Sequence, residues 1–154
     1  MKKFLLSIMT LKKYYPHLVI TSLALILQVP IWLGYTDFYS GRGSDLIPYI
    51  YGTKRLMYDT FQTLGEIPLW NPYFMFGQPI VGNVQYNIFY PLNILFFVFP
   101  FFTALWIHQL IHMILAGIGT LMLARHTGLS RLACLISGCL YMFNGRLLYY
   151  INAG

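Results

Sequence analysis

Apolar side chains fill three long stretches of this chain, and the first stretch runs from about residue 18 to residue 35. It contains no Asp, Glu, Lys or Arg over its 18 residues. At about 1.5 Å per residue, such a helix is about 27 Å long, close to the thickness of a bilayer core. Tyrosine and tryptophan flank both ends, which is typical of a membrane–water interface. The pattern predicts a transmembrane helix over 18–35 that follows a cytoplasmic or interfacial lead-in over 1–17.

The second apolar stretch covers residues 88–124 and is interrupted by two prolines and an asparagine. Two transmembrane helices need about 40 residues, so this stretch has room for one of them and a shorter element. We expect residues 102–124 to cross the membrane. Residues 88–100 then form a short interfacial helix.

The third apolar stretch predicts a transmembrane helix over 132–151, and Ser130 is placed to cap its first turn. A cytoplasmic turn with two arginines, residues 125–131, joins it to the second span. The chain then stops at the expected membrane edge without a polar tail. We therefore expect it to be the N-terminal part of a longer multispan protein, truncated after residue 154.

Between the first two spans, residues 36–101 are rich in polar, aromatic, glycine and proline residues and hold all four acidic side chains. From Leu46 to Leu64, apolar residues recur with helical spacing, and polar residues occupy the other face. This pattern predicts a helix over 46–64 that lies on the membrane surface and ends at Gly65.

Composition agrees with this pattern and excludes other classes of protein. Hydrophobic residues make up 58% of the chain and charged residues 9%, whereas a soluble domain carries about 25% charged residues. A chain this apolar cannot form a soluble fold of this size, and it is too apolar to be disordered. We predict an all-α integral membrane protein with about three transmembrane helices and one or two interfacial helices in a long outer loop.

The net charge of +6 indicates how the chain is oriented. Basic residues concentrate before the first span and in the turn at 125–131, and the positive-inside rule places both segments in the cytoplasm. The N-terminus is then cytoplasmic, and residues 36–101 lie outside. No basic patch interleaved with aromatic residues and no Cys/His finger spacing points to a nucleic acid. The expected partner is the lipid bilayer.

The outer loop carries the most specific motifs. It reads Glu66-Ile-Pro-Leu-Trp-Asn-Pro-Tyr73, then Phe76-Gly-Gln-Pro79, then Tyr90-Pro-Leu-Asn93. Two further segments follow in the apolar part, Leu123-Ala-Arg125 and Tyr141-Met-Phe-Asn-Gly145. Together these motifs resemble the N-terminal region of the YfhO-like bacterial membrane proteins, which are similar to the GT-C class of glycosyltransferases. The resemblance covers about residues 44–154.

The resemblance implies a GT-C-like, multi-pass protein of the bacterial cytoplasmic membrane. It implies transfer of a sugar from a polyprenyl-phosphate-linked donor to an envelope polymer or lipid acceptor at the outer face. GT-C enzymes place an acidic residue in the first outer loop, as catalytic base or as part of a metal site. Asp45 matches that position, with Ser44 in place of the family's glycine, and Asp37 is a second candidate. A divalent cation is the cofactor that such a carboxylate would hold.

Asp45 could equally cap the helix that begins at Leu46. Other loop residues are candidates for contact with the donor, each with a structural alternative. Lys54 and Arg55 would bind the donor phosphate or anchor lipid headgroups. Aromatic rings would stack on a sugar or lie at the lipid interface, and amides would bind sugar hydroxyls or tie the loop together. These candidates are Trp70 and Tyr73 among the aromatic residues, and Asn71, Gln78, Asn83 and Gln85 among the amides.

Two further patterns bear on function. His108 and His112 lie one helical turn apart, but Gln109 replaces the glutamate of a zinc-protease helix, so we expect them to pack between helices. The alternative function is that of a non-enzymatic membrane component, either a lipid-carrier transporter or an envelope-assembly subunit. The first two predicted spans lack ionisable Asp, Glu, Lys or Arg residues, which argues against a transporter.

Overall fold

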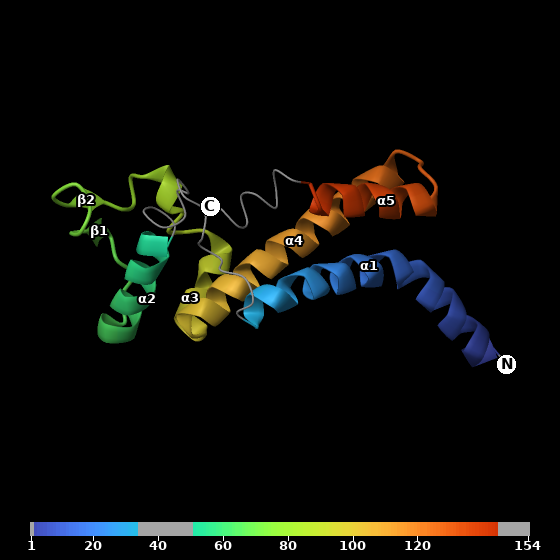
Figure 1. Cartoon of the computed structure of the whole chain (residues 1–154), viewed down its shortest axis with the longest axis horizontal. Helices are drawn as coiled ribbons and strands as arrows, with labels where there is room; N and C mark the ends of the chain where they lie inside the picture. Colours follow the sequence, from blue (N-terminus) through green and yellow to red (C-terminus); the bar gives the residue numbers. More distant parts are fainter. Residues whose placement is uncertain (1, 34–50, 145–154) are drawn as a thin grey trace. The chain divides into compact units, whose positions relative to one another are not determined.

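The computed structural model of the chain describes residues 2–33 and 51–144, except for the side chains of residues 2–13, 31, 32 and 85. The described residues are mostly helical, which confirms the all-α class (Figure 1). The chain divides into two compact units, the first made of residues 1–36 and 110–148 and the second of residues 37–109 and 149–154.

The first unit contains helix α1 (Lys2–Trp32), most of helix α4 (Phe101–His126) and helix α5 (Arg131–Met142). Helix α1 runs through both the expected lead-in and most of the expected first span without a break. Pro16 lies inside this helix, where a proline removes one backbone donor and favours a bend.

Helix α4 is long and apolar enough to cross a membrane, and among the described residues it is the one helix that meets both conditions. Its bounds exceed the expected span 102–124 by one residue at the start and two at the end. Tyr14–Pro30 of α1 and helix α5 are apolar but shorter. Helix α5 ends at Met142, and the remaining part of the expected third span, from residue 145, lies outside the described residues.

The turn between α4 and α5 follows from its sequence. Gly128 adopts a left-handed conformation with φ of 84°, a conformation that favours glycine. Leu129 donates its backbone N–H to the carbonyl of Ala124 at 3.2 Å, which closes the end of α4. Ser130 accepts a hydrogen bond from the N–H of Ala133 at 3.3 Å. The expected N-cap of the third apolar helix is thereby confirmed.

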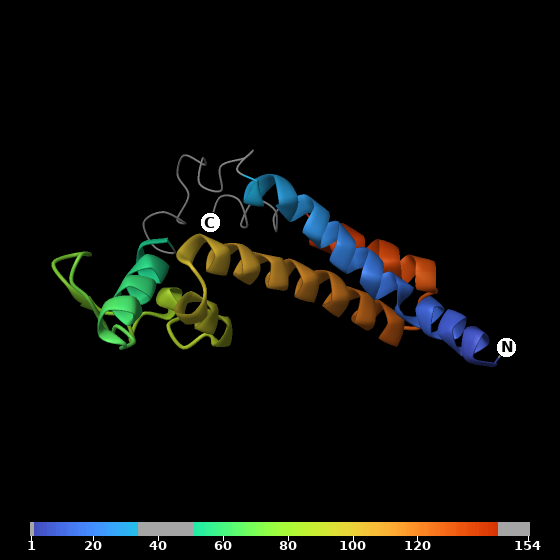
Figure 2. The same cartoon turned by 90° about the horizontal axis from the view of Figure 1, so that it is seen from below.

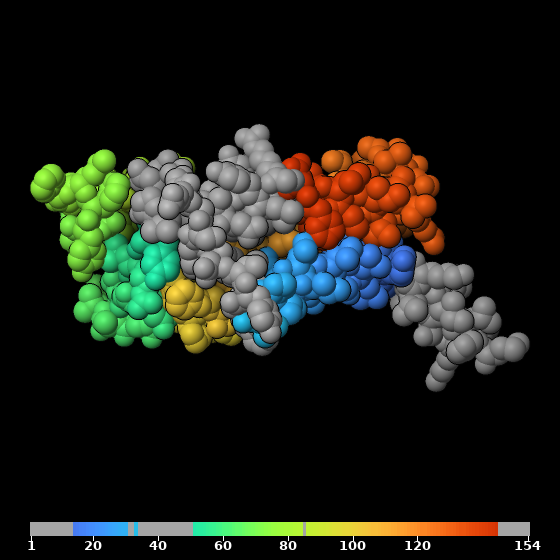
Figure 3. Space-filling view, in the orientation of Figure 1, coloured from blue at the N-terminus to red at the C-terminus, as the bar shows by residue number. Residues whose placement is uncertain are grey.

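Small residues let the three helices of the first unit pack closely (Figures 2 and 3). A Cβ atom built on Gly138 of α5 would lie 2.8 Å from the carbonyl oxygen of Gly117 in α4 and 2.8 Å from Ile20 in α1. Ile20 is itself completely buried. Nearby, the side-chain nitrogen of Gln28 lies 2.9 Å from the sulfur of Met113 and links α1 to α4.

The second unit begins with helix α2 (Gly52–Leu64), followed by a short hairpin in which β1 (Trp70–Asn71) pairs antiparallel with β2 (Gln78–Pro79). The expected end of α2 is confirmed, because Gly65 terminates the helix in a left-handed conformation with φ of 71°. The helix was expected to begin at residue 46. The structure shows it from Gly52, and residues 46–50 lie outside the described part.

The segment expected to be an interfacial helix over 88–100 is shorter and irregular. It consists of a 3₁₀ turn (Pro91–Ile94) that leads into the single turn of α3 (Leu95–Val98). Phe99 is extended, as expected for a residue that precedes a proline. Helix α4 then begins at Phe101. The core of this unit is built from two apolar clusters, Met57 with Ile80, Tyr86 and Ile88, and Phe96 with Phe101, Ala104 and Leu105.

We expect Gly138→Ala to lower the free energy of unfolding of the first unit by about 1–3 kcal/mol, because the new methyl group meets backbone that cannot move aside. Denaturant titration of the purified chain in a mild detergent measures this change. Gly119→Ala is the matched control, since a Cβ there meets nothing within 4 Å. Equal effects of the two substitutions would show that close packing at Gly138 is not required.

Candidate functional site

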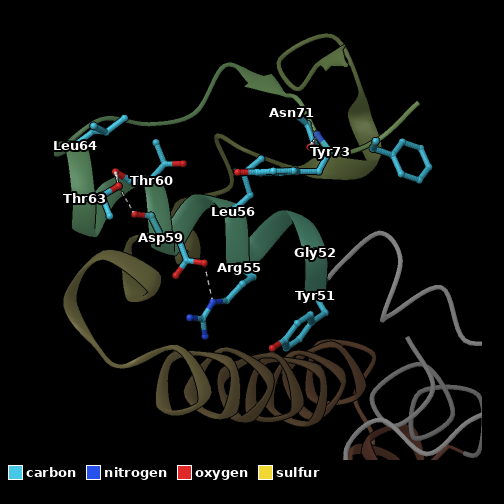
Figure 4. Close-up of a pocket in the computed structure, with 11 residues that line it drawn as sticks. Tyr51, Gly52, Arg55, Leu56, Asp59, Thr60, Thr63, Leu64, Asn71 and Tyr73 are labelled. Carbon is cyan, nitrogen blue, oxygen red and sulfur yellow. Dashed lines mark hydrogen bonds and ion pairs between the residues drawn. The ribbon is translucent and has the colours of Figure 1, made fainter. Parts of the chain in front are cut away.

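The second unit contains an open cleft of about 580 Å³ between helix α2 and the segment that follows β1 (Figure 4). A cavity of this size suits a small ligand. Polar side chains of α2 form one wall, and an amide and aromatic rings form much of the rest. The lining residues are Tyr51, Gly52, Arg55, Leu56, Asp59, Thr60, Thr63, Leu64, Asn71, Tyr73 and Phe74.

Residues spaced by four along α2 supply the polar wall, since this spacing places them on one face of a helix. Arg55 donates from Nε to the carboxylate of Asp59 at 2.9 Å. Both side chains are close to half exposed. One turn later, the hydroxyl of Thr63 donates to the backbone carbonyl of Asp59 at 2.7 Å. The cleft therefore presents a cation, a carboxylate and hydroxyl groups in one row.

Arg55 is held in place by aromatic rings as well as by its carboxylate. The centre of its guanidinium lies 5.5 Å from the ring of Tyr58 and 5.4 Å from the ring of Phe101, within the range of cation–π attraction. The hydrogen bond that Arg55 donates to Asp59 is the main cause that raises the pKa of Arg55 above its ordinary value. Among the described residues, no hydrogen bond engages the two terminal nitrogens of Arg55. These donors remain available to a ligand.

The opposite wall is formed by a tight turn. The backbone N–H of Tyr73 donates to the side-chain oxygen of Asn71 at 2.9 Å, a local bond typical of asparagine in turns. Asn71 is buried, whereas Tyr73 is 86% exposed. The ring of Tyr73 reaches across the cleft toward α2 (Figure 4). An exposed ring in this position can stack on a ligand.

The hairpin behind this turn is closely packed. The indole of Trp70 lies on Gly77, where a built Cβ would approach the ring to 2.8 Å. Gly77 also has a φ of 105°, which a side chain would strain. The side-chain amide of Gln78 donates to the hydroxyl of Tyr86. Trp70 and Gln78 therefore support the hairpin and do not line the cleft.

Lys54 precedes Arg55 in sequence but is buried on another side of α2, at 6% exposure. Its ammonium donates to the side-chain oxygen of Asn93 at 2.7 Å and lies 3.4 Å from the carbonyl oxygen of Tyr86. Asn93 in turn donates to the carbonyls of Asn87 and Ile88. Lys54 therefore fastens α2 to the segment that leads into α3.

Burial without a carboxylate partner destabilises the charged form of Lys54. The described part of the chain places no carboxylate within ion-pair distance of its ammonium. Desolvation by burial lowers the pKa of Lys54 from 10.5 to about 8. At neutral pH the ammonium is still mostly protonated, and Asn93 compensates part of the lost hydration.

Of the residues expected to contact a substrate, the structure brings Arg55, Asn71 and Tyr73 together around the cleft. It does not bring Lys54, Trp70, Gln78 or Asn83 to that cleft. The catalytic candidates Asp37 and Asp45, and the side chain of Gln85, lie outside the described residues.

Sequence reasoning missed three residues of the polar wall: Asp59, Thr60 and Thr63. A signal was available for two of them. Asp59 follows Arg55 by four residues, and Thr63 follows Asp59 by four. This spacing places Asp59 and Thr63 on the same helix face as Arg55.

Candidate metal ligands were sought among the side chains of the described residues. No three His, Cys, Asp or Glu side chains of the described ranges lie close enough to share a cation. The carboxylate in the cleft is already bonded to Arg55. His108 packs beside the rings of Tyr90 and Phe96, each with a centroid 5.8 Å away, which agrees with a packing role.

Comparison of the chain with known protein families, with curated proteins and with solved structures finds no match. What the chain does must therefore be argued from its motifs and from the geometry of the cleft.

The lowered pKa of Lys54 predicts a pH dependence of stability. Between pH 8 and 10.5 the unfolded chain holds a proton that the folded chain has released. The contribution of Lys54 to the free energy of unfolding should therefore rise through this window, by about 3 kcal/mol at most. Denaturant titrations at about pH 7.5 and about pH 10 measure the rise. In Lys54→Met this contribution should be absent, and an equal rise in that variant would contradict the assignment.

Proposed function

We propose that this chain belongs to a membrane glycosyltransferase that uses a polyprenyl-phosphate-linked sugar at the outer face of a bacterial cytoplasmic membrane. The observation that carries this proposal is the cleft beside α2, which combines an anchored cation, hydroxyl groups and an exposed aromatic ring. The loop motifs that resemble YfhO-like proteins support the same function.

The groups in the cleft match the parts of such a donor. A sugar phosphodiester has a single negative charge, and the terminal nitrogens of Arg55 can donate to its phosphate oxygens. The hydroxyls of Thr60 and Thr63 and the carboxylate of Asp59 can exchange hydrogen bonds with sugar hydroxyls. The exposed ring of Tyr73 can cover an apolar face of the sugar. Asp59 acts as a positioning residue because it orients the guanidinium.

The location of the cleft also suits a lipid-linked donor. It belongs to the same unit as the first turns of α4, the helix long and apolar enough to span a bilayer. In the proposed topology this end of α4 faces the outer leaflet, since the basic residues Arg125 and His126 lie at its other end. The polyprenyl tail would stay in the lipid while the sugar phosphate reaches the cleft.

In the proposed reaction an acceptor hydroxyl attacks the anomeric carbon of the sugar. The bond between that carbon and the phosphate oxygen breaks, and polyprenyl phosphate leaves with the electron pair. A carboxylate must take the proton from the attacking hydroxyl. Asp45 is the proposed base, on the strength of the family resemblance, with Asp37 as the second candidate.

The first test is binding of a probe, polyprenyl-phosphate-linked glucose, to the chain in lipid nanodiscs. We expect Arg55→Gln to weaken binding by roughly tenfold or more, because it removes charge-assisted hydrogen bonds to the phosphate. The affinity of Arg55→Lys for the probe should lie between those of the natural chain and Arg55→Gln, since lysine keeps the charge but lacks the paired donors of a guanidinium.

Gln62→Ala is the matched control for this test. Gln62 lies on the same helix, is exposed, and does not line the cleft. If Arg55→Gln bound the probe as tightly as Gln62→Ala, the cleft would not be the donor site.

The second test concerns catalysis. Asp45→Asn keeps the size of the side chain but removes the proton acceptor, so sugar transfer in membranes that carry the protein should fall by at least about a hundredfold. Membrane insertion, followed by resistance to alkaline extraction, should not change. Activity equal to that of the natural chain would eliminate Asp45 as the base.

A further inference from the structure

Two further cavities lie within the first unit, where Arg125 and Arg131 are found. The smaller cavity has a volume of about 80 Å³ and is lined by side chains of α1, the end of α4, the following turn and the start of α5. Its charged and polar lining includes His17, Arg125 and Arg131. The larger cavity, of about 320 Å³, is mainly apolar and is lined by Tyr15, Leu132 and Leu135 among others.

Pro16 and Arg131 line both cavities, which shows that the two are adjacent. A polar pocket therefore continues into an apolar groove across the side chain of Arg131. A soluble anion would use only the polar pocket. A molecule that carries an anionic group next to a hydrocarbon chain would use both.

Charge in this region has one sign. Arg125 and Arg131 are both exposed, and neither guanidinium makes a hydrogen bond or an ion pair with any described residue. The described residues of the first unit include no Asp or Glu at all. None of these described residues is an acid that could neutralise the two arginines or pair with a choline or ethanolamine group.

The position of the pocket matches the level of lipid headgroups. Arg125 lies in the last turn of α4, and a helix that crosses a bilayer ends where the headgroups begin. Exposed apolar side chains, Leu129 and Leu132, lie beside the arginines. This combination of basic and apolar side chains between helix ends is typical of sites for anionic lipids.

We propose that the paired cavities bind one anionic glycerophospholipid of the inner leaflet. Its phosphate lies between Arg125 and Arg131, with His17 close by, and one acyl chain occupies the groove beside Tyr15, Leu132 and Leu135. The lipid bridges α1, around Pro16, to the end of α4 and the start of α5. This inference rests on the membrane location proposed above but not on the sugar-transfer reaction.

Native mass spectrometry of the full chain in detergent, titrated with phosphatidylglycerol or phosphatidylcholine, tests the proposal. We expect phosphatidylglycerol to bind at least about tenfold more tightly than phosphatidylcholine, since two charge-assisted contacts favour the anionic headgroup. Arg125→Gln/Arg131→Gln should abolish this preference, and Arg125→Lys/Arg131→Lys should retain most of it. Equal binding of the two lipids by the natural chain would overturn the proposal.

Two controls separate this site from simpler explanations. Lys2→Gln/Lys3→Gln removes the same amount of positive charge and leaves Arg125 and Arg131 in place, so it should leave the lipid preference unchanged. An equal loss in this variant would mean that net charge alone attracts the lipid. Excess inorganic phosphate should displace little phosphatidylglycerol, and full displacement would show that the pocket takes free phosphate instead.

A photoactivatable phosphatidylglycerol tests the position without any substitution. Its acyl-chain label should react with residues 15–17 and 132–135 of the natural chain and not with residues 51–74. Labelling confined to the latter segment would overturn the proposed position. Because the label is read independently of sugar binding at α2, failure of this inference and failure of the proposed function are distinguishable.

Discussion

The second unit depends on one buried ammonium group. Lys54 is buried, with its ammonium 6.0 Å from the centre of the Phe96 ring, and its charge is compensated mainly by the side-chain oxygen of Asn93 at 2.7 Å. Because Asn93 also donates to two backbone carbonyls of the preceding segment, its contact with Lys54 links α2 to the segment that leads into α3. A buried polar network of this kind stabilises one arrangement of its members, because any other arrangement leaves a charge unsatisfied. The orientation of the cleft-lining face of α2 follows from it.

The apolar helices were predictable because each lies in a long run of sequence that contains few or no charged residues. No charged residue occurs between Glu66 and Arg125, so the most apolar part of that stretch had to form the central helix. Local signals were equally direct, since Gly65 ends α2 and Ser130 caps α5 as expected. Helix-forming segments with turn residues at their ends carry such information within a few neighbouring positions.

The assignment of site residues was less predictable, because it depends on which face of α2 is buried. Lys54 and Arg55 are neighbours in sequence, but consecutive residues point about 100° apart around a helix. One of them is buried in the core and the other lines the cleft. The amides show the same limit: Asn71 and Gln78 both belong to the hairpin, yet only contacts across the fold decide that Asn71 borders the cleft and Gln78 holds Tyr86.

The origin of the polar wall in one helix has a consequence for how such a protein can diverge. Arg55, Asp59 and Thr63 occupy successive turns of α2, and Asp59 contacts the other two through its carboxylate and its backbone carbonyl. In the proposed donor site, substitutions on this face would alter which ligand is accepted, while Lys54, on another side of the same helix, keeps its bond to Asn93. The proposed ligand contacts and the buried bond of Lys54 to Asn93 thus lie on separate faces of one helix, so the first can change in evolution while the second is kept.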